Sequence, residues 1–256
     1  ARPALSEADG FAVARLEEGL ALRAAGVTQP IVLLEGVFSA EQLLEAARHG
    51  FDMVVHDPLQ VELLEGYRGA QRYSLWLKID PGMIRLGSRP EDFAGVLARV
   101  QALKPPPLEV RVMTHLARAD ERDDATTRAQ VATFAKATAT LDSATSIANS
   151  AGVLGGVGLH CNWVRPGLAP YGAPPFSDQV GTQLGLQPVM TLESTVIATR
   201  RVPKGETVGY AGKWRAERYS SIAIIAAGYG DGLARSLPPG TPELIDGRSA
   251  TLVARL

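Results

Sequence analysis

The chain of 256 residues has almost no cysteine and no long hydrophobic run. Its one cysteine, Cys161, excludes an internal disulfide, so a reducing, cytoplasmic setting is expected. No stretch of about 20 apolar residues occurs, which predicts that no helix spans a membrane. The first residues contain no apolar core of a signal peptide.

The sequence also lacks an excess of charge of either sign. It has 26 Lys and Arg against 27 Asp and Glu, a formal net charge of -1. That balance argues against binding to nucleic acid or to an acidic membrane surface. The Gly-rich dinucleotide fingerprint is missing as well, and no metal site is predicted. With 46% hydrophobic residues, the chain can still bury a substantial core.

Short apolar runs alternate with amphipathic stretches over the first two thirds of the chain. Seven runs have the length and the Val, Ile and Leu content of buried parallel strands: 11–14, 31–34, 53–55, 75–79, 110–113, 146–148 and 164–169. Helical patterns lie between them at 16–22, at 39–42 with a capping-box start, at 90–100 and at 126–141. Seven such units in succession favour a closed barrel over an open sheet.

A (β/α)8 barrel needs an eighth strand. The chain opens almost directly on a strand, so the first strand is expected to be the missing one. After residue 178 the pattern becomes β-rich, with expected strands at 190–199, 221–226 and 250–253. We therefore predict an α/β fold of the TIM-barrel type over residues 1–178 and a β-rich C-terminal domain over 179–256. That domain is expected to be cut short, because Leu256 lies within an apolar run.

Polar side chains gather where the expected strands end. Each is unremarkable alone, since a single lysine or histidine at a strand end is commonly a packed or paired residue. The C-terminal strand ends of a parallel barrel, however, form its active-site face. Seven polar residues fall there: Lys78, Asp80, Arg85, His115, Asn149, Ser150 and Arg165. Together they predict an active site on this rim.

Six blocks, in order along the chain, resemble those of bacterial alanine racemases, which are fold-type III enzymes dependent on pyridoxal 5'-phosphate. They are W-L-K-I-D-P-G-M-I-R-L-G at 76–87, M-T-H-L-A-R-A-D at 113–120, A-N-S at 148–150, W-V-R-P-G-L-A-P-Y-G at 163–172, V-G-Y at 208–210 and G-Y-G-D-G at 228–232. The resemblance implies an isomerase that interconverts L- and D-alanine in a bacterial cytoplasm. Such an enzyme would either supply D-alanine for the synthesis of peptidoglycan or supply L-alanine for catabolism.

The resemblance assigns roles to single residues around the cofactor. Arg165 would face the pyridine nitrogen, and because a guanidinium keeps its proton, that nitrogen would stay unprotonated and withdraw electrons weakly. Ser150, Gly167 and Leu168 would hold the phosphate. His115 would stack near the ring and bond Arg165.

Further residues would contact the substrate side. Arg85 would reach the phenolic oxygen of the cofactor and the carboxylate of alanine. Lys78 would be carbamylated and would fix Arg85. Leu34 and Asn149 would line the site.

Racemisation needs a proton removed from one face of Cα and returned on the other. The resemblance implies that Tyr210, contributed by the partner subunit of a homodimer, serves one face and a lysine the other. An entryway layer would contain Asp120, Tyr229, Arg235 and Arg255.

The sequence departs from the family in three places. The block V-V-K-A-x-A-Y-G-H-G, which carries the lysine that binds the cofactor, does not occur, and the five lysines present are Lys78, Lys104, Lys136, Lys204 and Lys213. We therefore expect the chain as given to be inactive. Pro81 stands where the family has Thr or Ser. Ala211 and Gly212 stand in the reverse of the usual order, which costs about 1 kcal/mol if position 211 needs a positive φ.

Other interpretations remain open from the sequence. A broad-spectrum amino-acid racemase of the same fold is the nearest alternative. A decarboxylase of this fold would lack the V-x-Y base, and a non-catalytic barrel that binds pyridoxal phosphate would lack the β-rich domain. The last alternative is an inactive chain.

Overall fold

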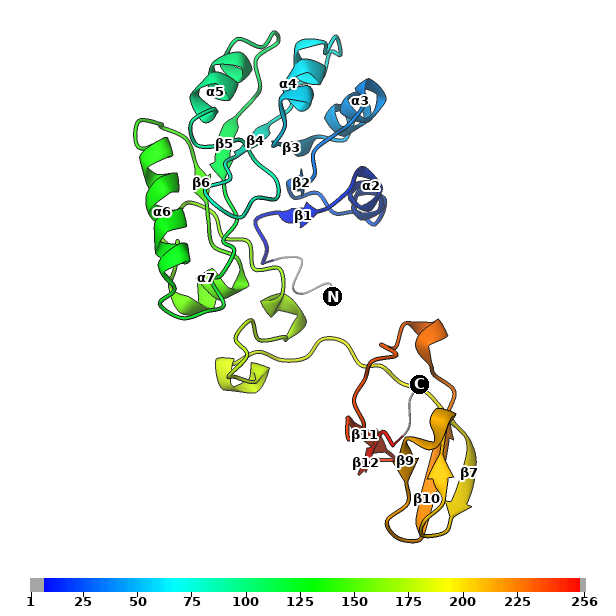
Figure 1. Cartoon of the computed structure of the whole chain (residues 1–256). Coiled ribbons are helices and arrows are strands. Elements are labelled where there is room, and N and C mark those ends of the chain that lie inside the picture. The colour runs from blue at the N-terminus through cyan, green and yellow to red at the C-terminus, as the bar shows by residue number, and fades with distance from the viewer. Residues whose placement is uncertain (1–6, 254–256) are drawn as a thin grey trace. The chain divides into compact units, whose positions relative to one another are not determined.

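The computed structural model describes residues 7–253. They form two compact units that divide between Val189 and Met190, whereas the sequence predicts the boundary after residue 178. We call them the barrel unit and the β-rich unit. Figure 1 shows both along the colour ramp, with the barrel unit in blue to yellow-green.

The barrel unit contains one sheet of six parallel strands in sequential order. The strands are β1 (Phe11–Val13), β2 (Ile31–Leu33), β3 (Phe51–Val55), β4 (Leu75–Lys78), β5 (Val110–Met113) and β6 (Thr145–Ser146). The helices are α2 (Leu16–Ala24), α3 (Ala40–Arg48), α4 (Pro58–Glu65), α5 (Phe93–Gln101), α6 (Ala125–Thr138) and α7 (Ser150–Gly155). In Figure 1 the helices from α2 to α6 lie outside the curved sheet. This architecture confirms the prediction of a partial barrel.

The expected seventh strand at 164–169 is wrong. Only an isolated parallel bridge joins Trp163 to Ser146, and the chain then turns into a 3-10 helix at Ala169–Tyr171. Pro166 has no N–H to give to a ladder, which explains why the strand does not continue. Helix α4 was also missing from the predicted pattern.

The two faces of the sheet carry different side chains. Odd-numbered positions of β2 to β4, such as Leu33, Met53 and Leu77, belong to the large core shared with the helices. Even-numbered positions such as Val54 and Trp76 belong to a second, smaller cluster on the inner face. Since side chains alternate along a strand, Lys78 falls on the inner face at the end of β4.

The helix starts follow ordinary capping chemistry. Ser39 accepts a hydrogen bond from the N–H of Gln42 at 3.2 Å, as its pattern predicts. Asn149 caps α7 by accepting from the N–H of Gly152 at 2.9 Å. A residue expected to line the site is thus also a helix cap.

The β-rich unit consists of three two-stranded antiparallel sheets. They pair β7 (Val196–Val202) with β10 (Ser220–Ile225), β8 (Thr207–Val208) with β9 (Trp214–Arg215), and β11 (Pro242–Ile245) with β12 (Arg248–Thr251). The strand expected at 190–199 begins only at Val196. Across residues 7–253, no helix is long and apolar enough to cross a membrane.

Candidate functional site

The loop after β4 is organised by one carboxylate. Asp80 accepts hydrogen bonds from the backbone N–H groups of Gly82, Met83, Ile84 and Arg85 at 2.7–3.0 Å. Burial raises the pKa of Asp80, but these four bonds outweigh it and lower the pKa below its usual value. Pro81, which replaces the family's Thr or Ser, has no N–H and takes no part in this set. The ionised carboxylate therefore fixes the loop that carries Arg85.

Three cations lie close together at this end of the sheet. Burial lowers the pKa of Lys78 to about 8, and the positive charges of Arg85 and Arg165 lower it further, against the opposing effect of Asp80. About a tenth of this amine is therefore neutral at pH 7, far more than for an ordinary lysine. The local excess of positive charge makes the site suited to an anionic ligand.

We expect Lys78→Met to stabilise the barrel unit at neutral pH in buffer free of carbon dioxide. The folded-state pKa of Lys78 lies below its unfolded value of 10.5, so folding carries the full penalty of the buried charge below about pH 8. The penalty, up to about 3 kcal/mol, disappears as pH rises from about 8 to about 10.5. Urea unfolding at a series of pH values measures it, with Lys136→Met on the exposed face of α6 as control. An equal gain at pH 7 and pH 10.5 would contradict the burial of a charged amine.

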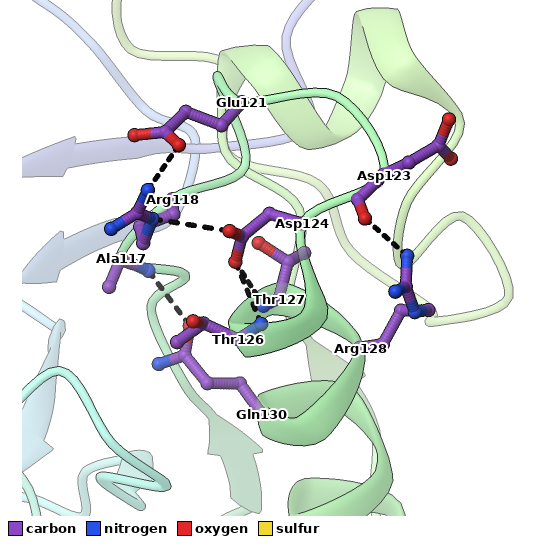
Figure 2. Close-up of polar contacts among 9 residues, drawn as sticks. All are labelled: Ala117, Arg118, Glu121, Asp123, Asp124, Thr126, Thr127, Arg128 and Gln130. Atoms are coloured by element: carbon purple, nitrogen blue, oxygen red, sulfur yellow. Dashed lines mark hydrogen bonds and ion pairs between the residues drawn. The ribbon is translucent and has the colours of Figure 1, made fainter.

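His115 follows β5, and a buried side chain holds its backbone carbonyl by a hydrogen bond. Gln130, fully buried on α6, accepts from the N–H of Ala117 at 3.0 Å and donates to the carbonyl of His115 at 3.5 Å. Figure 2 shows Gln130 below Ala117, beside the loop in which Arg118 is ion-paired with Glu121 and Asp124. Burial and then the charges of Arg165, Arg85 and Lys78 lower the pKa of His115 to about 4. The imidazole is therefore neutral at neutral pH.

Arg165 is the best-anchored cation of the site. Its guanidinium donates to the hydroxyl of Ser146 and to the carbonyl of Thr114, and its backbone N–H donates to the carbonyl of Ala148 at 2.8 Å. Burial lowers its pKa to about 10, so it keeps its charge at neutral pH. The sequence patterns assigned no role to Ser146 or Thr114. A hydroxyl inside the apolar run 146–148 was the only signal for Ser146.

Two backbone N–H groups and a hydroxyl meet at the start of α7. The hydroxyl of Ser150 accepts from the N–H groups of Leu168 and Ala169 at 2.8 and 3.0 Å. A Cβ built on Gly167 would meet no atom within 4 Å, so open space lies beside this turn. Ser150, Gly167 and Leu168 are thus neighbours, as the sequence predicts for a phosphate site. Leu34 lies against the inner-face cluster of Val54, Trp76 and Met113.

The segment around Tyr210 lies in the β-rich unit. The side chain of Tyr210 is 80% exposed, between Gly209 with φ of 76° and Ala211 with φ of 60°. The left-handed conformation expected to make alanine costly at position 211 is therefore present. Its neighbour Gly212 also has a positive φ, of 55°.

We expect Ala211→Gly to stabilise the β-rich unit by about 1 kcal/mol, because glycine adopts a left-handed backbone without a steric penalty. Gly212→Ala is the matched control and should destabilise it, since its Cβ would lie 3.0 Å from the hydroxyl of Thr207. Chemical denaturation monitored at Trp214 gives both values. A loss of stability in Ala211→Gly would show that the left-handed turn does not strain the alanine.

Three of the four residues expected at the entryway are exposed: Asp120, Tyr229 and Arg235. Asp120 lies in the barrel unit and the other two in the β-rich unit. Arg255 lies outside the described residues.

The structure thus brings together Lys78, Asp80, Arg85, His115 and Arg165. The groups around Ser150, at the start of α7, form a second set.

Comparison with known proteins finds matches to the same family in both units of the chain. A sequence profile described as "Alanine racemase, N-terminal domain" matches residues 1–175, and one described as "Alanine racemase, C-terminal domain" matches residues 189–256. The alanine racemase of Azoarcus sp. (strain BH72) is 47% identical over 251 residues, which cover 98% of this chain and 70% of that protein. That of Shewanella woodyi is 42% identical over 252 residues, with coverage of 98% and 70%.

Solved structures agree with these relatives. The biosynthetic alanine racemase of Pseudomonas aeruginosa superposes with a TM-score of 0.92 at 39% identity, covering 99% of this chain and 71% of that one. An alanine racemase from Bartonella henselae, described with covalently bound pyridoxal phosphate, gives a TM-score of 0.75 at 26% identity, with coverage of 90% and 64%.

Proposed function

This chain belongs to the alanine racemase family, and we propose that its residues form the cofactor and substrate site of a pyridoxal-phosphate enzyme that interconverts L- and D-alanine. The reaction is an isomerisation at Cα. The observation that supports the proposal is that Lys78, Arg85, His115 and Arg165, all from the blocks shared with the family, meet at one end of the sheet.

The site fits pyridoxal phosphate in three respects. A phosphate needs backbone N–H groups and a hydroxyl. The N–H groups of Leu168 and Ala169 lie together with the hydroxyl of Ser150 beside open space at Gly167; they donate to that hydroxyl in this structure and would turn to a bound phosphate. The ring nitrogen needs a donor, which Arg165 supplies as a buried guanidinium. The excess of positive charge suits a dianionic cofactor and a carboxylate substrate. When bound, the cofactor supplies the electron withdrawal that makes the Cα proton acidic.

The protein's own residues then direct the chemistry. Arg165 stays protonated and keeps the ring nitrogen a hydrogen-bond acceptor, which restrains electron withdrawal and favours racemisation over side reactions. Arg85, on the loop fixed by Asp80, orients the carboxylate of alanine. His115 is neutral, so it adds no further positive charge beside the ring. Leu34 and Asn149 border the site.

Lys78 is the proposed site of carbamylation. Its neutral amine attacks the carbon of carbon dioxide, an N–C bond forms and a proton is released, which leaves a carbamate anion. A cation surrounded by Arg85 and Arg165 thereby becomes an anion that attracts them. The lowered pKa of Lys78 supports this step, because only the neutral amine reacts.

Tyr210 is proposed as the base for the second face of Cα, contributed across a homodimer. Its exposed side chain is available to a partner subunit. Asp120, Tyr229, Arg235 and Arg255 are proposed to form the entryway to the site. A cytoplasmic setting and a role in supplying D-alanine for peptidoglycan belong to the same proposal.

The activity is tested by supplying the lysine block that the sequence lacks. The chain is fused at its N-terminus to a segment with the family's V-V-K-A-x-A-Y-G-H-G block and loaded with pyridoxal phosphate. We expect L-alanine to become a mixture of both enantiomers, measured by chiral chromatography. A fusion with Arg in place of the block's lysine is the control. Turnover of lysine or ornithine without turnover of alanine would favour a broad-spectrum racemase instead.

A further inference from the structure

A buried ion pair lies on the inner face of the sheet, and the proposed chemistry does not use it. The Nη1 of Arg111 is 2.6 Å from the Oδ2 of Asp52, and these side chains are only 13% and 12% exposed. The Nε of Arg111 also donates to Glu109 at 2.7 Å. The charged edge of the guanidinium is thus held in a fixed plane by two carboxylates.

Two indole rings contact the same guanidinium. The Cζ of Arg111 is 5.3 Å from the ring centroid of Trp76 and 5.4 Å from that of Trp163. The two indoles meet edge to face with centroids 6.0 Å apart, and the Nε1 of Trp76 donates to Asp52 at 3.3 Å. Arg111 is therefore the centre of a cluster that joins β3, β4 and β5 to the segment after β6.

Such a cluster is costly to bury, because both charges lose water. Apolar residues at positions 52 and 111 would pack against the neighbouring Val54 and Met113 without that cost. A buried ion pair therefore adds little to stability. Its role is more readily explained by the groups that it holds in place. The group it contacts outside the sheet is the indole of Trp163.

Trp163 is the anchor of the segment 163–165, which does not continue as a strand. The N–H of Trp163 donates to the carbonyl of Thr145 at 3.1 Å, and the hydroxyl of Ser146 donates to the carbonyl of Trp163 at 2.9 Å. Arg165, at the other end of the segment, is held by its own N–H bond to the carbonyl of Ala148 at 2.8 Å, so the contact with Arg111 is the side-chain anchor at the Trp163 end.

The same segment carries Arg165. The hydroxyl of Ser146 that donates to Trp163 also accepts from the guanidinium of Arg165. A shift of Trp163 therefore moves both the backbone of Arg165 and one acceptor of its side chain.

We propose that Arg111, held by Asp52, is a positioning residue that docks the indole of Trp163 and so places the guanidinium of Arg165 at the cofactor's ring nitrogen. The inference rests on the proposed function, in which Arg165 contacts that nitrogen. Arg111 itself touches neither cofactor nor substrate.

The test measures the contact with the ring nitrogen directly on the 256-residue chain. The probes are pyridoxamine 5'-phosphate, which has no aldehyde to react with lysine, and its 1-deaza analogue, in which CH replaces the ring nitrogen. The ratio of their dissociation constants reports the Arg165 contact. We expect the wild-type chain to prefer the nitrogen-containing probe by about 10-fold or more, as for a hydrogen bond from a charged donor.

Arg165→Leu should remove this preference. Arg111→Leu and Trp163→Leu should reduce it to about threefold or less while leaving the affinity for the deaza analogue nearly unchanged, because the phosphate donors are intact. Arg111→Lys should also reduce the preference, since an ammonium keeps the charge but lacks the planar fork of donors that bonds Asp52 and Glu109 together. Arg99→Leu is the matched control, because Arg99 is paired with Glu65 at 2.8 Å and is not part of the cluster.

A double variant guards against simple unfolding. Asp52→Leu with Arg111→Leu removes both charges and leaves an apolar layer, so it should fold and still lose the preference. Amide hydrogen exchange without any ligand should become faster at Trp163 and Arg165 in each Arg111 variant.

If Arg111 variants keep the wild-type ratio while Arg165→Leu loses it, the positioning role is wrong and the proposed function stands. If the wild-type chain shows no preference, the assignment of Arg165 fails, and the positioning role fails with it.

Discussion

Tyr210→Phe is expected to slow proton transfer on one face of Cα by about 10²- to 10⁴-fold, the range for loss of a general base. Racemisation needs a base on each face, so removal of one hydroxyl should affect one enantiomer far more than the other. The side chain is 80% exposed and lies in a tight left-handed turn, so it takes little part in the packing of its own unit. The phenylalanine variant should therefore fold normally.

The measurement is the exchange of the Cα hydrogen in deuterated water, followed separately for L- and D-alanine in the fusion that carries the lysine block. We expect one enantiomer to exchange at nearly the wild-type rate and the other to exchange much more slowly. Tyr219→Phe is the control, because Tyr219 is also an exposed tyrosine of the β-rich unit. Equal, small effects on both enantiomers would show that Tyr210 is not the second base.

Strand periodicity was enough to place Lys78 and Asp80 at one edge of the sheet. Apolar runs of three to five residues predict buried parallel strands, and the residues that follow them must meet at one edge of the sheet. The six-stranded sheet confirms this reasoning for Lys78 and Asp80, which end and follow β4. The pattern at 164–169 misled because periodicity counts side chains, whereas a ladder requires the N–H that Pro166 lacks.

The partners of these groups were not predictable in the same way. Arg165 bonds to a main-chain carbonyl at Thr114 and to a hydroxyl at Ser146, 51 and 19 residues earlier in the chain. Because every residue has a backbone carbonyl, a sequence does not indicate which carbonyl will accept a hydrogen bond. The four N–H groups around Asp80 are a similar case, since their convergence depends on loop dihedrals, including a positive φ at Ile84.

The chain as given is expected to bind pyridoxal phosphate without racemising alanine. The proposed phosphate-binding groups of Ser150, Leu168 and Ala169 do not include a lysine, so we expect non-covalent binding. Proton abstraction, however, needs both a covalent imine link to the substrate and a base on each face. None of the five lysines lies in the block that supplies the family's lysine base.

The lysines present are poorly suited to take over that role. Four of them are exposed: Lys104, Lys136, Lys204 and Lys213. Lys78 alone is buried beside Arg85 and Arg165, and its pKa of about 8 makes it the most reactive amine of the site. Once it is carbamylated, as proposed, its nitrogen belongs to a carbamate, which neither condenses with an aldehyde nor takes a proton from Cα.

Borohydride reduction decides between these outcomes. The chain is mixed with pyridoxal phosphate, its visible spectrum is recorded before and after reduction, and the labelled peptide is mapped. We expect no stoichiometric adduct at one lysine and no D-alanine from L-alanine. Lys78→Met is the control, and any scattered labelling of exposed lysines should persist in it. A reducible band that maps to Lys78, disappears in Lys78→Met and accompanies D-alanine formation would overturn the prediction, because Lys78 would then serve as both anchor and base.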